Sequence, residues 1–152
     1  MYDVLPGWYT TIHTIYYISG RLVSILAIVL FIFLVLIKVF KIRKDQYQDL
    51  LNIANLALCI ISTVLLASYG LELAIAIFNG FIVEQYSFLS RAVGPYWISY
   101  ILLIWIPLLL TQLLWKKSNR LNVNISLCIV ILLNLHMWLE RFIIIVTTLM
   151  RN

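Results

Sequence analysis

The chain has 152 residues, of which 64% are hydrophobic and only 11% are charged, and its mean hydropathy is +1.03. A water-soluble domain needs far more charge on its surface, so this composition excludes a soluble protein and predicts an integral membrane protein. The formal net charge of +5 comes from short basic clusters between apolar runs, which is the pattern of membrane topology signals. No nucleic acid is therefore expected as a partner.

Four apolar stretches are long enough to predict transmembrane helices, since a span needs about 20 residues. They cover residues 11–40, 50–79, 97–115 and 121–150, and they predict an all-α, four-helix transmembrane bundle in a single domain. Polar residues recur at helical spacing on the first two helices, and both stripes are predicted to face the bundle. The stripes are His13, Tyr17, Gly20 and Ser24, and then Asn55, Cys59, Ser62, Tyr69 and Glu72.

The connections carry the topology signals. Residues 79–96 form the longest connection, and loops of this length are more often functional than idle. Pro95 suits the first turn of the third helix, and Pro107 predicts a kink inside it. Residues 38–45 and 116–120 are predicted basic loops on one side, which is the inner side by the positive-inside rule, so both termini are expected outside. Seven of the eleven basic residues lie there: Lys38, Lys41, Arg43, Lys44, Lys116, Lys117 and Arg120.

The charged residues inside the spans are predicted to share one layer of the membrane. At about 1.5 Å per helical residue, Arg21, Glu72 and Glu140 lie roughly 25, 35 and 30 Å above the basic loops. That is near the outer edge of a hydrocarbon core about 30 Å thick. The full set of candidate proton-transfer or quinone-region residues is Glu72, Glu140, Arg141, Arg21, His136, Glu84, Arg91 and His13.

Two interpretations of this layer stay open. In one, the arginines merely pair with the acids and form a neutral network that sets the helix register. In the other, the same groups carry protons or bind a polar head group, and His136 and Glu140 are four residues apart, so they share a helix face. Aromatic residues make up 14% of the chain, and those expected at the outer side fit an interfacial belt better than a quinone site. They are Trp8, Tyr9, Tyr16, Tyr17, Tyr86, Tyr96 and Trp97.

Several classes of site are not expected. Cys59 and Cys128 lie in apolar runs without His or Cys at ligand spacing, so both are predicted to be buried, with no metal site or disulfide. Haem is disfavoured because His13 and His136 lie on different helices. The sequence has no glycine-rich phosphate loop, zinc motif or Ser-His-Asp arrangement. Its start, Met1-Tyr2-Asp3, does not resemble a cleaved signal peptide.

Short motifs spread over nearly the whole chain are similar to a known membrane family. They are Pro6-Gly7-Trp8, Tyr69-Gly70-Leu71-Glu72, Asn79-Gly80, Glu84-Gln85-Tyr86, Arg91-Ala92, Gly94-Pro95-Tyr96-Trp97, Arg120-Leu121-Asn122 and Met137-Trp138-Leu139-Glu140-Arg141-Phe142. They resemble the NrfD/PsrC-like integral membrane subunits, and above all the second four-helix bundle of the ActC subunit of alternative complex III, a quinol-oxidising complex.

The resemblance implies a role within a larger assembly. In that family two four-helix bundles lie side by side, the quinone site is placed in the first bundle, and the second is proposed to help carry protons. This chain looks like the second bundle alone, so a multi-helix membrane subunit is expected to supply the first. Quinol is expected in the complex, with iron-sulfur clusters and haems in peripheral iron-sulfur or cytochrome subunits, and no cofactor is expected on this chain itself.

The sequence also departs from the family pattern. Tyr9 stands where the family usually has His, His136 replaces a small residue, Thr111 replaces a Pro, and the chain stops at Asn152 where the family continues. The expected membrane is an energy-coupling one, either the bacterial cytoplasmic membrane or the mitochondrial inner membrane, with lipid around the helices. The alternatives are a structural anchor for peripheral redox subunits and a small transporter, the latter disfavoured because no internal inverted repeat is visible.

The predicted topology is testable by cysteine labelling. A cysteine in place of Ser118 should react only with reagent on the inner side, and one in place of Ser87 only with reagent on the outer side, because the basic loops stay inside. Labelling of position 118 from outside would overturn both the orientation and the depths of the charged layer.

Overall fold

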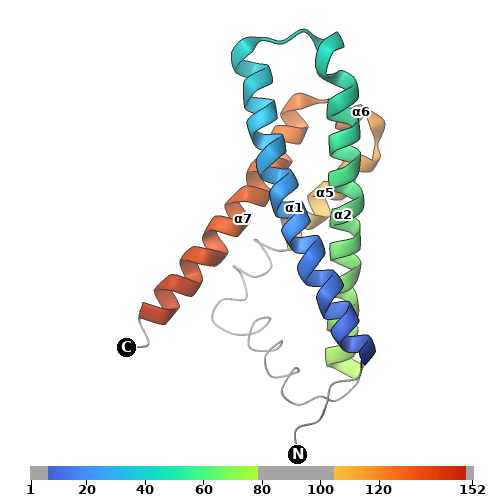
Figure 1. Cartoon of the computed structure of the whole chain (residues 1–152), viewed down its shortest axis with the longest axis vertical. Coiled ribbons are helices and arrows are strands. Elements are labelled where there is room, and N and C mark those ends of the chain that lie inside the picture. The colour runs from blue at the N-terminus through green and yellow to red at the C-terminus, as the bar shows by residue number, and fades with distance from the viewer. Residues whose placement is uncertain (1–6, 79–104, 150–152) are drawn as a thin grey trace, which may run out of the picture.

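The computed structural model describes residues 7–78 and 105–149, and these residues form helices joined by short turns (Figure 1). The all-α prediction is therefore confirmed for this part of the chain. In chain order the elements are α1 (Gly7–Phe40), α2 (Lys44–Phe78), α5 (Ile106–Thr111), the 3-10 helix η2 (Gln112–Trp115), α6 (Lys117–Arg120) and α7 (Val123–Leu149).

The first connection is shorter than predicted. The helix α1 continues to Phe40 and α2 begins at Lys44, so the basic loop expected over residues 38–45 is a turn of three residues. Lys41 has a positive φ of 48°, and the N–H of Ile42 donates to the carbonyl of Ile37 at 3.3 Å. This left-handed residue closes the end of α1 and reverses the chain within a few residues.

In the second half of the chain, short helical segments replace part of the predicted third span and the loop that follows it. Pro107 lies in the first turn of α5, where a missing N–H costs no hydrogen bond. The kink predicted there involves residues before Trp105, which lie outside the described residues. The predicted loop at 116–120 is mostly the helical turn α6, and the side chain of Asn122 caps α7 by accepting from the N–H groups of Asn124 and Ile125 at 3.0 and 3.4 Å.

The helices α1 and α2 pack against each other through residues spaced alternately three and four apart. This spacing keeps one narrow stripe of each helix facing its neighbour, as in a coiled coil. We call the two stripes together the α1–α2 seam. The α1 stripe is Tyr16, Gly20, Val23, Ala27, Leu30, Leu34 and Ile37, and the α2 stripe is Leu51, Asn55, Leu58, Ser62, Leu65 and Tyr69, all of them buried or partly buried.

Two contacts define the antiparallel register of this seam. The hydroxyls of Tyr16 and Tyr69 are 2.8 Å apart, and a Cβ on Gly20 would lie 3.8 Å from Leu65 Cδ1. Each step along α1 is thus matched by an equal step back along α2. Continued toward the other end of the helices, the same register leads to the turn at residues 41–43. The position of the turn is therefore consistent with the pairing of residues along the seam.

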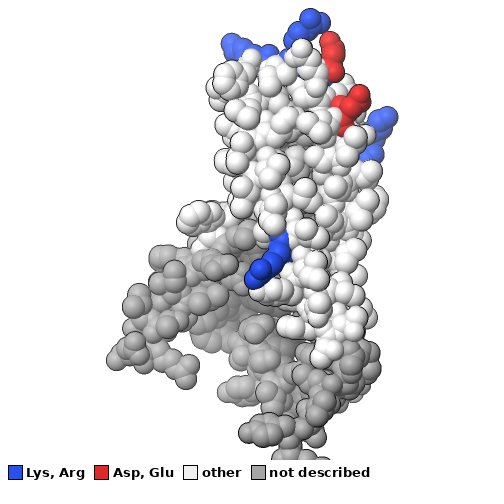
Figure 2. Space-filling view, viewed as in Figure 1, with Lys and Arg blue, Asp and Glu red and all other residues white. Residues whose placement is uncertain are grey.

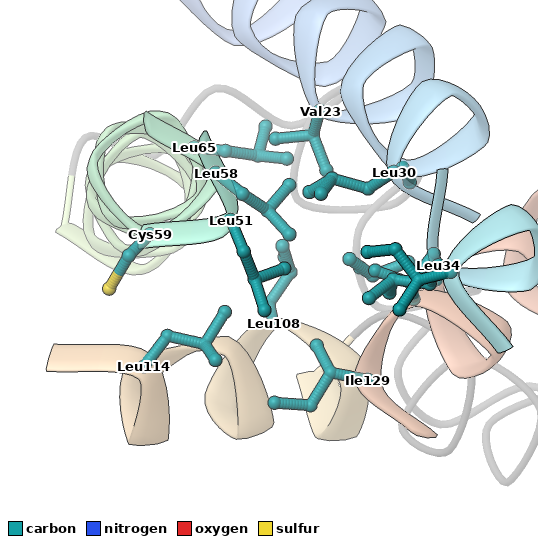
Figure 3. Packing of buried hydrophobic residues seen from close by; sticks show 14 residues of the cluster. Val23, Leu30, Leu34, Leu51, Leu58, Cys59, Leu65, Leu108, Leu114 and Ile129 are labelled. Carbon is teal, nitrogen blue, oxygen red and sulfur yellow. The ribbon is translucent and has the colours of Figure 1, made fainter. Parts of the chain in front are cut away.

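The remaining elements close one side of this helix pair. The helix α7 packs on α1, where Asn134 Nδ2 donates to the backbone carbonyl of Ala27 at 3.2 Å. The elements α5 and η2 pack on α2, and Leu108, Leu114 and Ile129 meet the seam leucines in one apolar core (Figure 3). Both basic clusters lie toward the same end of the helices (Figure 1).

The outer surface of the described helices is largely apolar. Two stretches, Thr10–Phe40 and Lys44–Leu71, are long and apolar enough to cross a membrane, with hydropathies of 3.1 and 2.2. Only 28% and 33% of the most apolar part of each stretch is buried inside the structure, whereas the core helix of a soluble protein is mostly buried. Charged side chains gather at the end where α1 meets α2, and the face below is almost uncharged (Figure 2).

The positive φ at Lys41 generates a stability prediction. Replacing Lys41 by Gly should raise the free energy of unfolding by a few tenths up to about 1 kcal/mol, because Gly adopts this conformation without steric cost. Lys38→Gly, one turn earlier and inside α1, is the matched control and should lower stability by about 1 kcal/mol. Thermal unfolding of both variants in detergent checks this, and a loss of stability in Lys41→Gly would contradict it.

Candidate functional site

The end of the α1–α2 seam distant from the turn at residues 41–43 holds a pair of hydrogen-bonded tyrosines. Tyr16 and Tyr69 share a 2.8 Å hydrogen bond between their hydroxyls, and their rings pack edge to face with centroids 4.8 Å apart. The ring of His13 lies 6.1 Å from that of Tyr16, and the ring of Trp105 lies 6.0 Å from that of Tyr69. Four aromatic rings from α1, α2 and the start of α5 thus surround one polar contact.

Arg21 was predicted to be a buried charge, and that prediction is wrong within this chain. Its side chain is exposed, and its guanidinium stacks over the ring of Tyr17 at 4.3 Å and donates to the Tyr17 hydroxyl. Gly20 and Val23 face α2 in the seam. Arg21, which lies between them in the sequence, therefore points away from α2. The predicted stripe on α1 is corrected in the same way, since Tyr17 is 52% exposed.

For the other predicted site residues within the described helices, the structure gives the position of the backbone. Glu72 lies on α2 three residues after Tyr69, and it continues the seven-residue spacing of Leu51, Leu58 and Leu65. His136, Glu140 and Arg141 lie on α7. Glu84 and Arg91 fall outside the described residues, so the common charged layer remains a prediction.

A second polar group lies deeper, between α2 and α5. The Thr111 hydroxyl donates to Ser62 Oγ at 2.7 Å, and the Cys59 thiol donates to the Thr111 carbonyl at 3.4 Å. All three residues are fully buried, and Ser62 also donates to the carbonyl of Cys59 at 3.0 Å. The predicted polar stripe on α2 therefore faces the bundle at these positions, where neutral groups satisfy one another.

Gln112 is the hub of this deeper network. Its Oε1 accepts from the Thr63 hydroxyl and from Trp115 Nε1, both at 3.0 Å. Its Nε2 donates at 3.3 Å to the carbonyl of Leu108 and to the hydroxyl of Thr111. A single amide thus joins α2, α5 and η2, and the turn between them depends on it.

A third polar group ties α6 to α2. Asn55, which is fully buried, donates through Nδ2 to the Arg120 carbonyl and to Ser126 Oγ, both at 2.7 Å. Three buried atoms beside this contact, Asn52 Oδ1, Asn55 Oδ1 and Arg120 Nε, have no hydrogen-bond partner among the described residues. Buried polar groups are normally paired, so among the described residues this is where the interior is least satisfied.

The deeper networks are separated from the tyrosine pair by apolar residues. Between Ser62 and Tyr69 the seam is built from Leu65 on α2 with Val23 and Gly20 on α1. The tyrosine pair and the group around Cys59, Ser62 and Thr111 therefore lie at separate levels of the seam. The deeper clusters consist of hydroxyl, thiol and amide groups.

The sequence prediction missed several of these residues. Tyr16, Thr63 and Gln112 were not named as site residues, although Tyr16 falls at seam spacing with Gly20, which is the signal that identifies it. Cys59 is buried as predicted, but Cys128 is exposed, since it faces away from its buried neighbours Ile129 and Val130. Across the part of the chain with described side chains, no three His, Cys, Asp or Glu residues cluster as metal ligands would.

Comparison with known proteins adds no assignment. No protein-family model matches the chain, and no curated protein matches it in sequence. The similarity to the NrfD/PsrC-like subunits therefore rests on the motifs quoted from the sequence.

The Gln112 hub generates the next prediction. Gln112→Leu should lower the free energy of unfolding by about 1–3 kcal/mol, because it removes the part-buried hydrogen bonds of the amide to Thr63, to Thr111 and to the Leu108 carbonyl. Gln46→Leu, on the exposed first turn of α2, is the matched control and should stay within about 0.5 kcal/mol of the parent. Equal midpoints for both variants in thermal unfolding would show that the hub does not stabilise the bundle.

Proposed function

We propose that this chain is a four-span membrane subunit of a respiratory quinol-oxidising complex, equivalent to the second half of an NrfD/ActC-type subunit. Its part is to help form the proton-transfer region at the outer side of the membrane. The observation that carries the proposal is the outer end of the α1–α2 seam, where the Tyr16–Tyr69 hydroxyl pair lies one turn before Glu72 on α2.

The chemistry of this end suits proton transfer. Phenol hydroxyls both donate and accept hydrogen bonds, and carboxylates and imidazoles exchange protons under physiological conditions. A charge at membrane depth costs roughly 2.5–3.5 kcal/mol, so acids retained in a span are functional by default. Glu72, Glu140 and His136 are the proposed proton-exchanging groups, with Glu84 and Arg91 at the outer mouth.

The surface of α1 supports a second membrane subunit as partner. Large apolar side chains repeat along its outer face at the same alternating spacing of three and four residues as the seam. They are Ile15, Ile18, Leu22, Ile25, Val29, Ile32 and Leu36. Arg21 lies beside this stripe and is exposed. Lipid covers apolar side chains without cost, whereas a guanidinium there needs water, head groups or an acid on a partner helix.

The proposed topology follows from the basic clusters. Both termini and residues 79–96 lie on the outer side, and the chain resides in an energy-coupling membrane, bacterial or mitochondrial. Quinol binds in the assembled complex, and the iron-sulfur clusters and haems belong to peripheral subunits. The chain is not proposed to catalyse oxidation alone.

A structural anchor remains the second candidate, and one observation favours it for the deeper half of the chain. The networks around Asn55, Thr111 and Gln112 use neutral groups that exchange no protons under physiological conditions. Their role is to set the helix register. The two candidate functions therefore differ in what they expect of the acids at the outer side.

The acids separate these two functions. Glu140→Gln keeps the shape and most hydrogen bonding of the side chain but cannot take up a proton, so the complex should assemble at normal yield while coupled quinol oxidation falls severalfold. Arg141→Leu should lower both yield and rate, because it leaves an acid without its neighbour. Yield and quinol oxidation rate are measured in the same preparations.

The anchor predicts a different pattern. If both substitutions act only through the yield of complex, and the Glu140→Gln complex turns over and releases protons at the parental rate, the proton-carrier role has no support.

A further inference from the structure

A second face of α1, away from the seam, is exposed along most of the helix and carries one charge. Its residues are spaced alternately four and three apart, which is the spacing of a helix surface that packs along another helix. All of them are exposed, and they are apolar except at Thr14 and Arg21. We call this set the Arg21 face, and it consists of Thr14, Ile18, Arg21, Ile25, Ile28, Ile32 and Val35.

The charge of Arg21 is not neutralised within the described part of the chain. Its guanidinium stacks on the ring of Tyr17 at 4.3 Å and donates to the Tyr17 hydroxyl, and no described carboxylate pairs with it. A guanidinium has five N–H donors in a planar fork, which suits a carboxylate bound through both oxygens. Tyr17 therefore orients the guanidinium and leaves its positive charge unmatched.

Arg21 also lies within the apolar part of α1. It is 17 residues before Lys38, so it lies roughly 25 Å from the end of the helices that carries the basic clusters, at about 1.5 Å per residue. The hydrocarbon core of a membrane is about 30 Å thick. Its neighbours on the face, Ile18 and Ile25, are 53% and 58% exposed. An arginine that faces lipid at this depth is unfavourable unless another group satisfies it.

We propose that the Arg21 face binds a transmembrane helix of a different subunit, and that this helix carries an Asp or Glu at the level of Arg21. The carboxylate accepts from the guanidinium N–H groups that Tyr17 leaves open, and apolar side chains of the helix pack on the isoleucines. This inference deepens the proposed function, and it rests on the part of it that makes the chain one subunit of a larger membrane complex.

The apolar side chains of the face suit a helix as their partner. Ile18, Ile25, Ile28, Ile32 and Val35 are all β-branched, so each has few rotamers and loses little conformational entropy when another helix packs on it. From position 14 to position 35 the face is roughly 32 Å long, which matches the length of a transmembrane helix. One partner helix can therefore cover the isoleucines and reach Arg21 at the same time.

A second copy of this chain does not fit the same face. Two copies in one membrane have the same orientation, so a two-fold axis beside α1 would bring the two Arg21 guanidiniums to the same level. Like charges that meet in an interface repel each other and act against that pairing. The charge of the face therefore selects a different subunit, one that brings an acid.

Photo-cross-linking of the full chain in its own membrane tests the occupant. Benzoylphenylalanine replaces Ile25 on the Arg21 face, and the matched control replaces Ile60, which is exposed on α2 at a similar height. Mass spectrometry should find position 25, and not position 60, joined to a transmembrane peptide of another subunit that contains Asp or Glu. The proposal is overturned if position 25 reacts with lipid alone, with a second copy, with a peptide that lacks an acid or with nothing, or if both positions reach the same peptide equally.

Charge exchange tests the ion pair with the subunit so identified. Arg21→Glu should lower the amount of that subunit recovered with the chain by about tenfold or more, because two acids then meet in apolar surroundings. Arg21→Lys, which keeps the charge, should retain most of it. Replacing the acid of the other subunit by Arg should restore recovery with Arg21→Glu. Undiminished recovery with Arg21→Glu, or no restoration by the double exchange, would contradict the pairing.

The level of the chain in the membrane is measured in every variant. It should not change, because the described contacts of the Arg21 side chain are confined to Tyr17. If Arg21→Glu lowers that level, Arg21→Gln replaces it, and full recovery of the other subunit with Arg21→Gln overturns the pairing.

The two proposals fail separately. An acid-bearing helix on the Arg21 face in a complex that does not oxidise quinol would sink the proposed function and leave the docking surface intact. A complex that oxidises quinol without such a helix on α1 would do the reverse.

Discussion

The close antiparallel packing of α1 against α2 is the constraint on which the rest of the structure depends. The alternating spacing of three and four residues keeps one stripe of each helix in contact with the other. The turn at residues 41–43 is so short that it fixes which residues of α1 and α2 lie opposite each other. The same register then continues along both helices. Every later contact, including the tyrosine pair, inherits that register.

Polar groups in the interior are matched by neutral partners. An amide or hydroxyl that is fully hydrogen-bonded costs little to bury, whereas an unpaired charge costs several kcal/mol. The described interior accordingly holds Asn55, Ser62, Thr111 and Gln112, and the charged side chains seen in Figure 2 lie at the end of the helix pair or on its surface. Such bonds also specify which helices pair, because an apolar interface between helices in lipid has little preference for one partner.

The separation of neutral polar networks from charged residues is relevant to the proposed function. The networks around Thr111 and Gln112 hold α2, α5 and η2 together, whereas Glu72 and Glu140, the acids of the proposed proton transfer, lie toward the ends of α2 and α7 distant from the basic turn. The exposed Arg21, beside an apolar stripe on α1, points to a face completed by something other than this chain. Both features support the proposed function, in which the chain contributes one wall of a proton-transfer region and a neighbouring subunit supplies the rest.

The sequence by itself determined the helical class, the long apolar stretches, the basic clusters at one end and the polar face of α2 at Asn55, Cys59 and Ser62. These depend on local composition and spacing. Only the tertiary structure decided that Arg21 faces outward, that Cys128 is exposed and that Tyr16 meets Tyr69. Two stripes of residues that differ by one position along a helix have the same periodicity in the sequence. Which of them is buried is therefore decided by the neighbouring helix that packs against it.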